Sequence, residues 1–471
     1  MDAKSMVRGC AIAAFSAYIL GCTTYPEAVR QTKTELLGGA QASYCGASAS
    51  GGDKLLAWME QGRLAQLQGH YRQSSDLYRK AISFCDALEE KAVISVGDAL
   101  DSTLAVMYGN DVTLDYPVVG FERMMLHQLD AINSLAVGDV DGFGVNIRHM
   151  ERCRGIETTR MKQYQDVINS KLGSEKVEAI ASNASYRKFM NDLQRLSPGL
   201  RHSTDNAYAL FLIALYREAI GDFEDARKYY EEILRILPNN SAATIGLSRC
   251  SGSSSVPVAH GEIVVLVEEG FMPEKRTDIV RMFENSSLLP TLYLKVPNYH
   301  DADCIPYDDG ASFYLLTSQG SLLTRTIPFC DLASLAIKSH EERMKGIIAR
   351  KVLSAGIMSA MVSAQHWHIH SSNPIVAGVL LVGGVVVDLT TASLVAVSEK
   401  TDLRSWLLLP RQVQIARKAV VESGTYNLIL KSPHGDKNVP VVVKKGKKTI
   451  VYCTSVPGKI ECFSSCLDAV K

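Results

Sequence analysis

Hydrophobic residues recur at helical spacing through the first half of the chain. From position 54 onward, Leu55, Leu56 and Met59 fall on one face of a helix, and a second apolar face follows between positions 71 and 88. Gly69 lies between the two segments, where the backbone must turn sharply. The pattern predicts a helix–turn–helix unit.

This unit resembles the tetratricopeptide repeat, a helix–turn–helix of about 34 residues whose copies stack into a solenoid. The best copy, at 207–240, has Ala214, Gly221, Ala226, Tyr230 and Pro238 in register. The first copy has Trp58, Gly62, Gly69, Tyr78 and Ala81 at the same spacing, with Ser74 in place of the usual alanine. A third, degenerate copy is centred on Ala131 and Gly138-Asp139. Small residues suit helix contacts, glycine suits the turn, and proline suits the end of the second helix.

The periodicity changes after position 255. Residues 250–255 (Cys-Ser-Gly-Ser-Ser-Ser) form a linker by composition, and the apolar run at 262–267 predicts a buried strand. Further strands are predicted at 292–296, 313–317, 322–328, 413–417, 424–431, 439–444 and 449–454. Between them, a long amphipathic helix is predicted at 332–365.

Residues 374–397 form a 24-residue apolar segment with one charge, Asp388. The length suits a membrane span. The central acid and the crowding of β-branched residues instead favour a buried helix that pairs with the preceding one, as a helical hairpin at about 332–398. The alternative is a glycine-lined surface for self-association or membrane contact.

The N-terminus has the pattern of a bacterial lipoprotein signal. Lys4 and Arg8 precede an apolar run that ends in Ile19-Leu20-Gly21, directly before Cys22. Gly21 is small enough to fit the prolipoprotein signal peptidase, and the Cys22 thiol carries the lipid. Thr23 after the cysteine indicates the outer membrane, so we expect a periplasm-facing protein anchored by acyl chains such as palmitate. The alternative is an ordinary secretory signal that contains a cysteine.

These features predict a multidomain fold. A signal peptide (1–21) and a tether (22–53) precede an all-α domain of tetratricopeptide-like helical repeats (54–249). An α+β domain with the long helical hairpin follows at 256–471. A short helix is predicted within the tether at 25–37.

Composition narrows the possible partners. Fifty basic residues balance fifty acidic ones, which excludes the basic footprint of a nucleic-acid-binding protein. An export signal places the cysteines in an oxidising compartment, where disulfides persist. The expected pairs are Cys304 with Cys330, and two among Cys453, Cys462 and Cys466. Their connectivity stays open.

Candidate chemistry is sparse. His366, His368 and His370 would share one face of a strand, but no cysteine or acid lies near them at ligand spacing, so no metal site is predicted. The sequence has no nucleophile elbow, phosphate-binding loop or zinc-protease helix. We therefore expect no cofactor and no enzymatic activity.

Several stretches together resemble a bacterial family of uncharacterised outer-membrane lipoproteins with a tetratricopeptide-like N-terminal half. The matching pieces are 116–120 with Glu122 and His127, 131–133 before Gly138-Asp139, 261–270 with Pro273 and Lys275, and Asp402, Arg404 and Trp406 before Pro410. The family has no established activity, and the resemblance implies a role in the envelope. Arg404 near Asp402 is expected to form a buried ion pair beside Trp406.

The expected function is that of a lipid-anchored scaffold or regulator of the bacterial cell envelope. Its concave repeat surface would bind a partner protein. The alternative is a self-associating subunit of an outer-membrane assembly or secretion complex, a homo-oligomer formed through 374–397.

Overall fold

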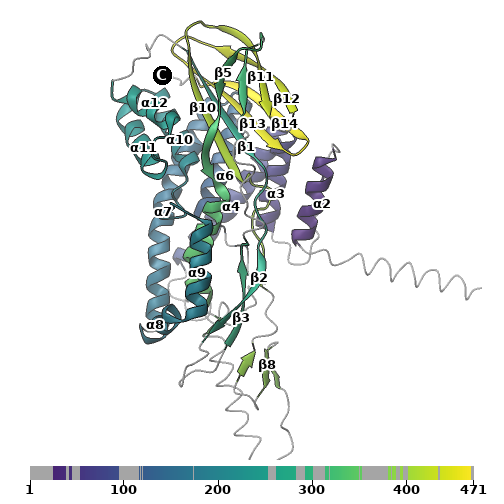
Figure 1. The fold of residues 1–471 in the computed structure, drawn as a ribbon, viewed down its shortest axis with the longest axis vertical. Helices are drawn as coiled ribbons and strands as arrows, with labels where there is room; N and C mark the ends of the chain where they lie inside the picture. Colours follow the sequence, from purple (N-terminus) through teal and green to yellow (C-terminus); the bar gives the residue numbers. More distant parts are fainter. Residues whose placement is uncertain are drawn as a thin grey trace, which may run out of the picture.

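Three layers make up the main body of the molecule, whose computed structural model is shown in Figure 1. The structure describes residues 25–38, 42–44, 54–94, 116, 118, 120–172, 174–252, 261–282, 292–300, 313–317, 319–348, 351–352, 380–382, 385–388, 393–395, 401–432 and 435–467. Helices form the first layer, a five-stranded sheet (sheet A) the second, and a four-stranded sheet (sheet C) the third.

The helical layer comes mainly from the first half of the chain. Its helices are α2 (Tyr25–Leu37), α3 (Lys54–Leu67), α4 (Tyr71–Ile94), α6 (Gly120–Ala136), α7 (Val140–Leu172), α8 (Ser174–Ser182), α9 (Ala184–Leu196), α10 (Ala207–Ala219), α11 (Phe223–Ile236) and α12 (Ser241–Cys250). The pairs α3–α4, α6–α7 and α10–α11 pack as helical hairpins. They coincide with the three predicted repeat copies.

The three hairpins turn in the same way. Gly69, Gly138 and Gly221 have φ angles of 79°, 78° and 84°, in the left-handed region that glycine enters without a Cβ clash. At each turn the glycine N–H donates to the carbonyl three residues earlier, and the next N–H donates to the carbonyl five residues earlier. The degenerate copy centred on Ala131 and Gly138-Asp139 therefore has the turn geometry of the other two.

Ser74, the polar departure in the first copy, has a structural reason. Its hydroxyl donates to the Gly62 carbonyl at 2.7 Å and accepts a hydrogen bond from Asn133 Nδ2 at 2.8 Å. Gln66 Nε2 donates to Asn133 Oδ1, also at 2.8 Å. These buried bonds join the first hairpin to α6, which an alanine at position 74 could not do.

Sheets A and C pack face to face. Sheet A has the order β14 (Lys459–Leu467), β13 (Lys448–Val456), β1 (Gly261–Glu269), β10 (Gln412–Val420) and β6 (Ile327–Asp331). Sheet C has the order β12 (Gly435–Val443), β11 (Gly424–Ser432), β4 (Tyr314–Leu316) and β5 (Leu322–Arg325). On β1, Ile263 and Val265 point into the core between the two sheets, whereas Val264 and Leu266 point into the core shared with the helices. Because this central strand is buried on both faces, its sequence is a continuous apolar run.

A third sheet, sheet B, corrects the prediction for 374–397. It has the order β2 (Arg276–Met282), β3 (Leu292–Asn298), β9 (Ser393–Val395), β8 (Val385–Asp388) and β7 (Leu380–Val382). The predicted second helix of the hairpin is therefore wrong for the described part of this segment. The physical reason is local: three consecutive valines in β8 favour a strand, and Gly383-Gly384 stands between the paired strands β7 and β8. The preceding helix is described at 332–348 and 351–352.

Part of the predicted tether is also packed. The short helix expected at 25–37 forms as α2, and it buries Tyr25, Val29 and Leu36 in the shared core. These residues recur at helical spacing, which gives α2 one apolar face. Among the helices in the described ranges, none is both long enough and apolar enough to span a bilayer.

The contact between Gly62 and Tyr78 predicts a stability difference between two glycine substitutions. A Cβ on Gly62 would lie 2.6 Å from the ring of Tyr78, which is itself buried, so we expect Gly62→Ala to lower the unfolding free energy by about 1–3 kcal/mol. Gly155, on α7, has open space around its Cβ position, so Gly155→Ala should be neutral or stabilising by up to about 1 kcal/mol. Urea denaturation of both variants measures the difference; equal stabilities would contradict the packing described.

Candidate interaction site

Sheet A presents a stripe to the helical layer that is apolar in the middle and charged at both ends. On β1, Val264 and Leu266 are flanked by Glu262 and Glu268, and all four side chains are buried. Burying a carboxylate costs free energy unless a cation and hydrogen bonds compensate it. Each end of the stripe therefore needs charged partners from the helices or from neighbouring strands.

At one end lies the Arg63 cluster, formed by Arg63 (α3), Tyr208 (α10), Glu268 (β1) and Tyr452 (β13). Arg63 Nη1 lies 2.7 Å from Glu268 Oε2, and both side chains are almost completely buried. Tyr452 and Tyr208 donate their hydroxyls to the two oxygens of Glu268 at 2.8 and 3.1 Å. Arg63 Nε also donates to the Leu408 carbonyl at 3.3 Å. This cluster joins two helices to two strands.

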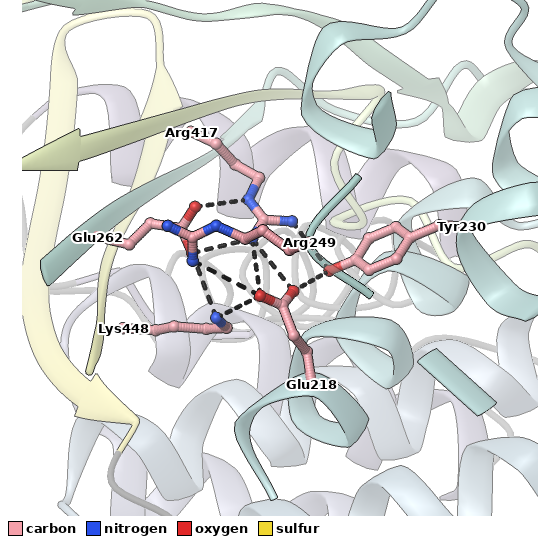
Figure 2. Close-up of polar contacts among 6 residues, drawn as sticks. All are labelled: Glu218, Tyr230, Arg249, Glu262, Arg417 and Lys448. Atoms are coloured by element: carbon pink, nitrogen blue, oxygen red, sulfur yellow. Dashed lines mark hydrogen bonds and ion pairs between the residues drawn. The ribbon is translucent and has the colours of Figure 1, made fainter. Parts of the chain in front are cut away.

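At the other end lies the Arg417 cluster, which Figure 2 shows. Its members are Glu218, Tyr230, Arg249, Glu262, Arg417 and Lys448. Arg417 Nη2, on β10, lies 3.1 Å from Glu218 Oε2 and 2.9 Å from Glu262 Oε2. Lys448 Nζ lies 2.6 Å from Glu218 Oε1, and Arg249 Nη1 lies 3.0 Å from Glu262 Oε2. Arg417 also donates to the Tyr230 hydroxyl, which donates in turn to Glu218.

The electrostatics of the Arg417 cluster favour charged carboxylates. Burial alone would raise the pKa of Glu218, but Arg417 and Lys448 outweigh it and lower that pKa to about 2. The same two cations lower the pKa of Glu262 against the effect of its burial. The carboxylates therefore contribute stability that is fully present above about pH 4.5 and is lost as the pH falls toward 2.

A loop at 405–409 is enclosed by the first hairpin and α6. Glu60 on α3 accepts the N–H groups of Leu407 and Leu408 at 2.7 and 3.0 Å, one on each carboxylate oxygen. Glu122 on α6 accepts the N–H of Trp406 at 3.3 Å. The indole of Trp406 is completely buried and meets the Tyr78 ring edge to face, with ring centroids 5.9 Å apart. The repeat face thus binds a segment of its own chain.

Residues on which the family resemblance rests, from 116–122, 275 and 402–404, lie together beside this loop. Arg404 forms a two-pronged ion pair with Asp402, with both contacts at 2.9 Å, and its guanidinium lies 5.8 Å from the centre of the Tyr116 ring. The Tyr116 hydroxyl donates to both oxygens of Glu122, at 2.7 and 2.9 Å. Lys275 Nζ donates to the Arg404 carbonyl at 2.9 Å. Stretches far apart in the sequence therefore meet at one place.

Glu60 differs from the carboxylates of the Arg417 cluster. Its burial raises its pKa from the ordinary 4.5 to about 7, although hydrogen bonds from Tyr25, Leu407 and Leu408 act in the opposite direction. The Tyr25 hydroxyl lies within hydrogen-bond distance of both Glu60 and the Ser405 carbonyl, so α2 closes this part of the site. Protonation of Glu60 near neutral pH is therefore coupled to the packing of the loop.

The inner face of the repeats was expected to receive a partner, and it is covered by sheet A and by the 405–409 loop. Tyr208, Phe211 and Leu215 on α10 are completely buried in the core that the helices share with sheet A. This finding corrects the expected position of a partner-binding surface. Only the outer side of the helical layer remains accessible among the described parts of the repeats.

The outer side of the first hairpin is hollowed. A cavity of about 480 Å³ lies between α3, α4 and residues 42–44. Its polar lining includes Gln61, Gln68, Gln73, Asp76 and Lys80. A second cavity of about 400 Å³ lies at the adjacent turns, lined by Gly69, His70, Tyr71, Arg72, Gln73 and Val137.

The remaining predicted residues have packing positions or lie outside the described residues. Ala81, Ala214 and Ala226 are buried, Trp58 packs edge to face on Phe84, Pro410 is buried, and Pro238 follows the end of α11. Ile19, Leu20, Gly21 and Cys22 lie outside the described residues, as do His366, His368 and His370. Within the described ranges, no group of three or more His, Cys, Asp or Glu residues could hold a metal ion.

Sequence reasoning missed the ion clusters. Glu60, Arg63, Glu218 and Arg417 each interrupt the apolar face of a helix or strand, which is the one local signal that could have singled them out. That signal does not identify the partner of each charge, because every partner lies on another element.

Comparison with known proteins supports the repeat assignment. Residues 207–240 match the tetratricopeptide repeat family, which confirms the copy predicted there. No curated protein and no solved structure matches the chain. Tetratricopeptide repeats are typical of protein-interaction scaffolds rather than of enzymes, so the matched segment indicates protein binding.

The Arg417 cluster predicts a large stability loss when its central cation is removed. Arg417→Met leaves two buried carboxylates with fewer counter-charges, so we expect the unfolding free energy to fall by about 3–5 kcal/mol. The matched control is Arg227→Met, because Arg227 forms an exposed pair with Glu231; its loss should be below about 1 kcal/mol. Chemical denaturation at pH 7 compares them, and similar losses would contradict the role assigned to the cluster.

Glu60 predicts a pH dependence of stability between pH 4.5 and 7. Because its folded-state pKa is raised, the native state holds a proton that the unfolded state releases, and stability falls as the pH rises through this window. We expect Glu60→Gln to abolish this component, which is on the order of 3 kcal/mol. Denaturation curves at pH 5 and 8 measure it, with the exposed Glu231→Gln as control. Parallel pH profiles for wild type and Glu60→Gln would exclude a raised pKa.

Proposed function

We propose that this chain is a lipid-anchored, periplasm-facing scaffold or regulator of the bacterial cell envelope. It binds a partner protein through the outer side of its helical repeats. The observation that carries the proposal is the combination of a tetratricopeptide repeat at 207–240 with an inner repeat face that is already filled. A partner is therefore bound at the hollowed outer side of the first hairpin.

The outer side has the chemistry to bind a polypeptide. Residues 42–44 form one wall of the larger cavity, and side chains hold their backbone: Gln68 Nε2 donates to the Ala42 carbonyl at 2.9 Å, and Thr32 Oγ1 donates to the Ser43 carbonyl at 3.3 Å. Gln61 and Gln73 line the same cavity, and a glutamine amide can both donate to and accept from a peptide backbone. A segment of the partner would lie beside 42–44 and be bound in the same way.

The anchor would place the helical layer close to the membrane. The lipoprotein pattern at Ile19-Leu20-Gly21-Cys22 supports acylation of Cys22. Helix α2 begins at Tyr25, three positions later, and three residues span at most about 11 Å. Since α2 is packed into the core, an acylated Cys22 leaves little free length between the membrane and the repeats.

In-cell experiments on the full chain test the anchor and the partner surface separately. Palmitate should label wild type but not Cys22→Ser, and wild type should fractionate with the outer membrane. A photoreactive residue at Gln73 or Lys80 should give one adduct with an identifiable envelope protein. The same photoreactive group placed at Leu322, an exposed position on β5 of sheet C, should give no adduct with that protein.

Three outcomes would contradict the proposal. Unlabelled wild type would exclude the lipid anchor, and equal adducts from Gln73 and Leu322 would exclude a specific outer surface. The third is an adduct with a second copy of the chain, accompanied by a dimer of Cys22→Ser in sedimentation. It would favour the alternative of a self-associating subunit.

A further inference from the structure

Two cysteines face each other across the last hairpin of sheet A, which Figure 1 shows in yellow. Cys453 on β13 is the direct partner of Cys462 on β14 in the antiparallel register. The strands are joined by Pro457-Gly458, and Val456 pairs with Lys459 at this two-residue turn. In a two-residue hairpin the pair that flanks the turn, here Val456–Lys459, is hydrogen-bonded, and the two kinds of pair alternate along the strands from there. Cys453–Cys462, three pairs further on, is therefore a non-hydrogen-bonded pair.

This position matches the geometry of a disulfide. Cα atoms of a non-hydrogen-bonded antiparallel pair lie about 4.5 Å apart, and a disulfide bridges Cα atoms about 4.4–6.8 Å apart. Cys466 is paired with Thr449, four residues along β13 from Cys453, or about 13 Å away at strand spacing. Of the two cysteines on β14, only Cys462 can therefore reach Cys453.

The two thiols differ in their exposure to solvent. Cys453 is completely buried between sheets A and C, whereas Cys462 is partly exposed at the edge of that core. Both are thiols in this structure. Because Cys462 is partly exposed, an oxidant can reach it from solvent.

We propose that Cys453 and Cys462 form an oxidisable dithiol that a disulfide oxidant converts into a cross-strand disulfide. The Cys462 thiolate attacks one sulfur of the oxidant, forms a mixed disulfide and releases the first oxidant thiol. The Cys453 thiolate then attacks Cys462 Sγ and releases the second thiol. The two protein thiols together lose two electrons, and the oxidant disulfide gains them and becomes two thiols.

The second step depends on deprotonation of the buried Cys453 thiol. Burial raises the pKa of the Cys453 thiol, and the neighbouring Cys462 raises it further, so little thiolate is present at neutral pH. The mixed disulfide at Cys462 should therefore accumulate briefly and close faster at higher pH. Closure joins the two strands covalently at the edge of the sheet.

Oxidised glutathione and tryptic mapping test the inference on the purified full chain. Trypsin cleaves after Lys448 and Lys459, so Cys453 lies on peptide 449–459, and Cys462 and Cys466 lie on peptide 460–471. Oxidation should link these two peptides in non-reducing mass spectrometry, with loss of two hydrogen atoms, and a reductant should separate them. Cys466→Ser should keep the link, and Cys453→Ser should stop at the mixed disulfide.

Two results would overturn the inference. One is a loss of two hydrogens within peptide 460–471 alone, which would indicate a Cys462–Cys466 bond. The other is a full chain that keeps both thiols, or only the mixed disulfide, after prolonged oxidation at pH 8. Circular dichroism of each cysteine variant establishes that it is folded, so a missing link cannot come from misfolding.

Discussion

Pairing of buried charges across the helix–sheet interface is the constraint on which the rest of the structure depends. Glu262 and Glu268 on the central strand are both inaccessible to water, and their cations come from α3, α12, β10 and β13. The apolar stripe between them supplies most of the burial, but it is not directional. The charged ends fix how the helices align with sheet A, because a shift between them would leave a carboxylate buried and unpaired.

This constraint explains why the helical repeats do not form an open solenoid. In an array that binds partners along its inner face, that face stays accessible. Here α3 and α10 use the same face to bind sheet A, and Glu60 and Glu122 use it to bind the 405–409 loop. Side chains that depart from the repeat pattern, such as Ser74, serve contacts within the chain.

The two proposed sites use side chains that do not belong to the buried ion clusters. The outer side of the first hairpin has a polar cavity and already holds the backbone of residues 42–44 through side chains. The last hairpin of sheet A carries the facing cysteines at an edge of the sandwich.

Much of the local structure was predictable from sequence. Helical periodicity with glycine at the turns located the three helical hairpins, and the apolar run at 262–267 located β1, because these patterns depend on neighbours within a few residues. The valine-rich segment at 385–388 was misjudged, because a short apolar run suits a buried helix as well as a strand, and the pairing of β9 with β3 decides between them.

The charged site could not be predicted in the same way. Arg417 and Glu218 are 199 positions apart, and neither position has a local pattern that points to the other. The amino-acid sequence by itself determined most of the helices, turns and strands, the 374–397 segment excepted, since backbone propensity and side-chain periodicity act over short distances. Only the tertiary structure decided which face each segment buries and which charge neutralises which, because those choices depend on contacts between elements that are remote in the chain.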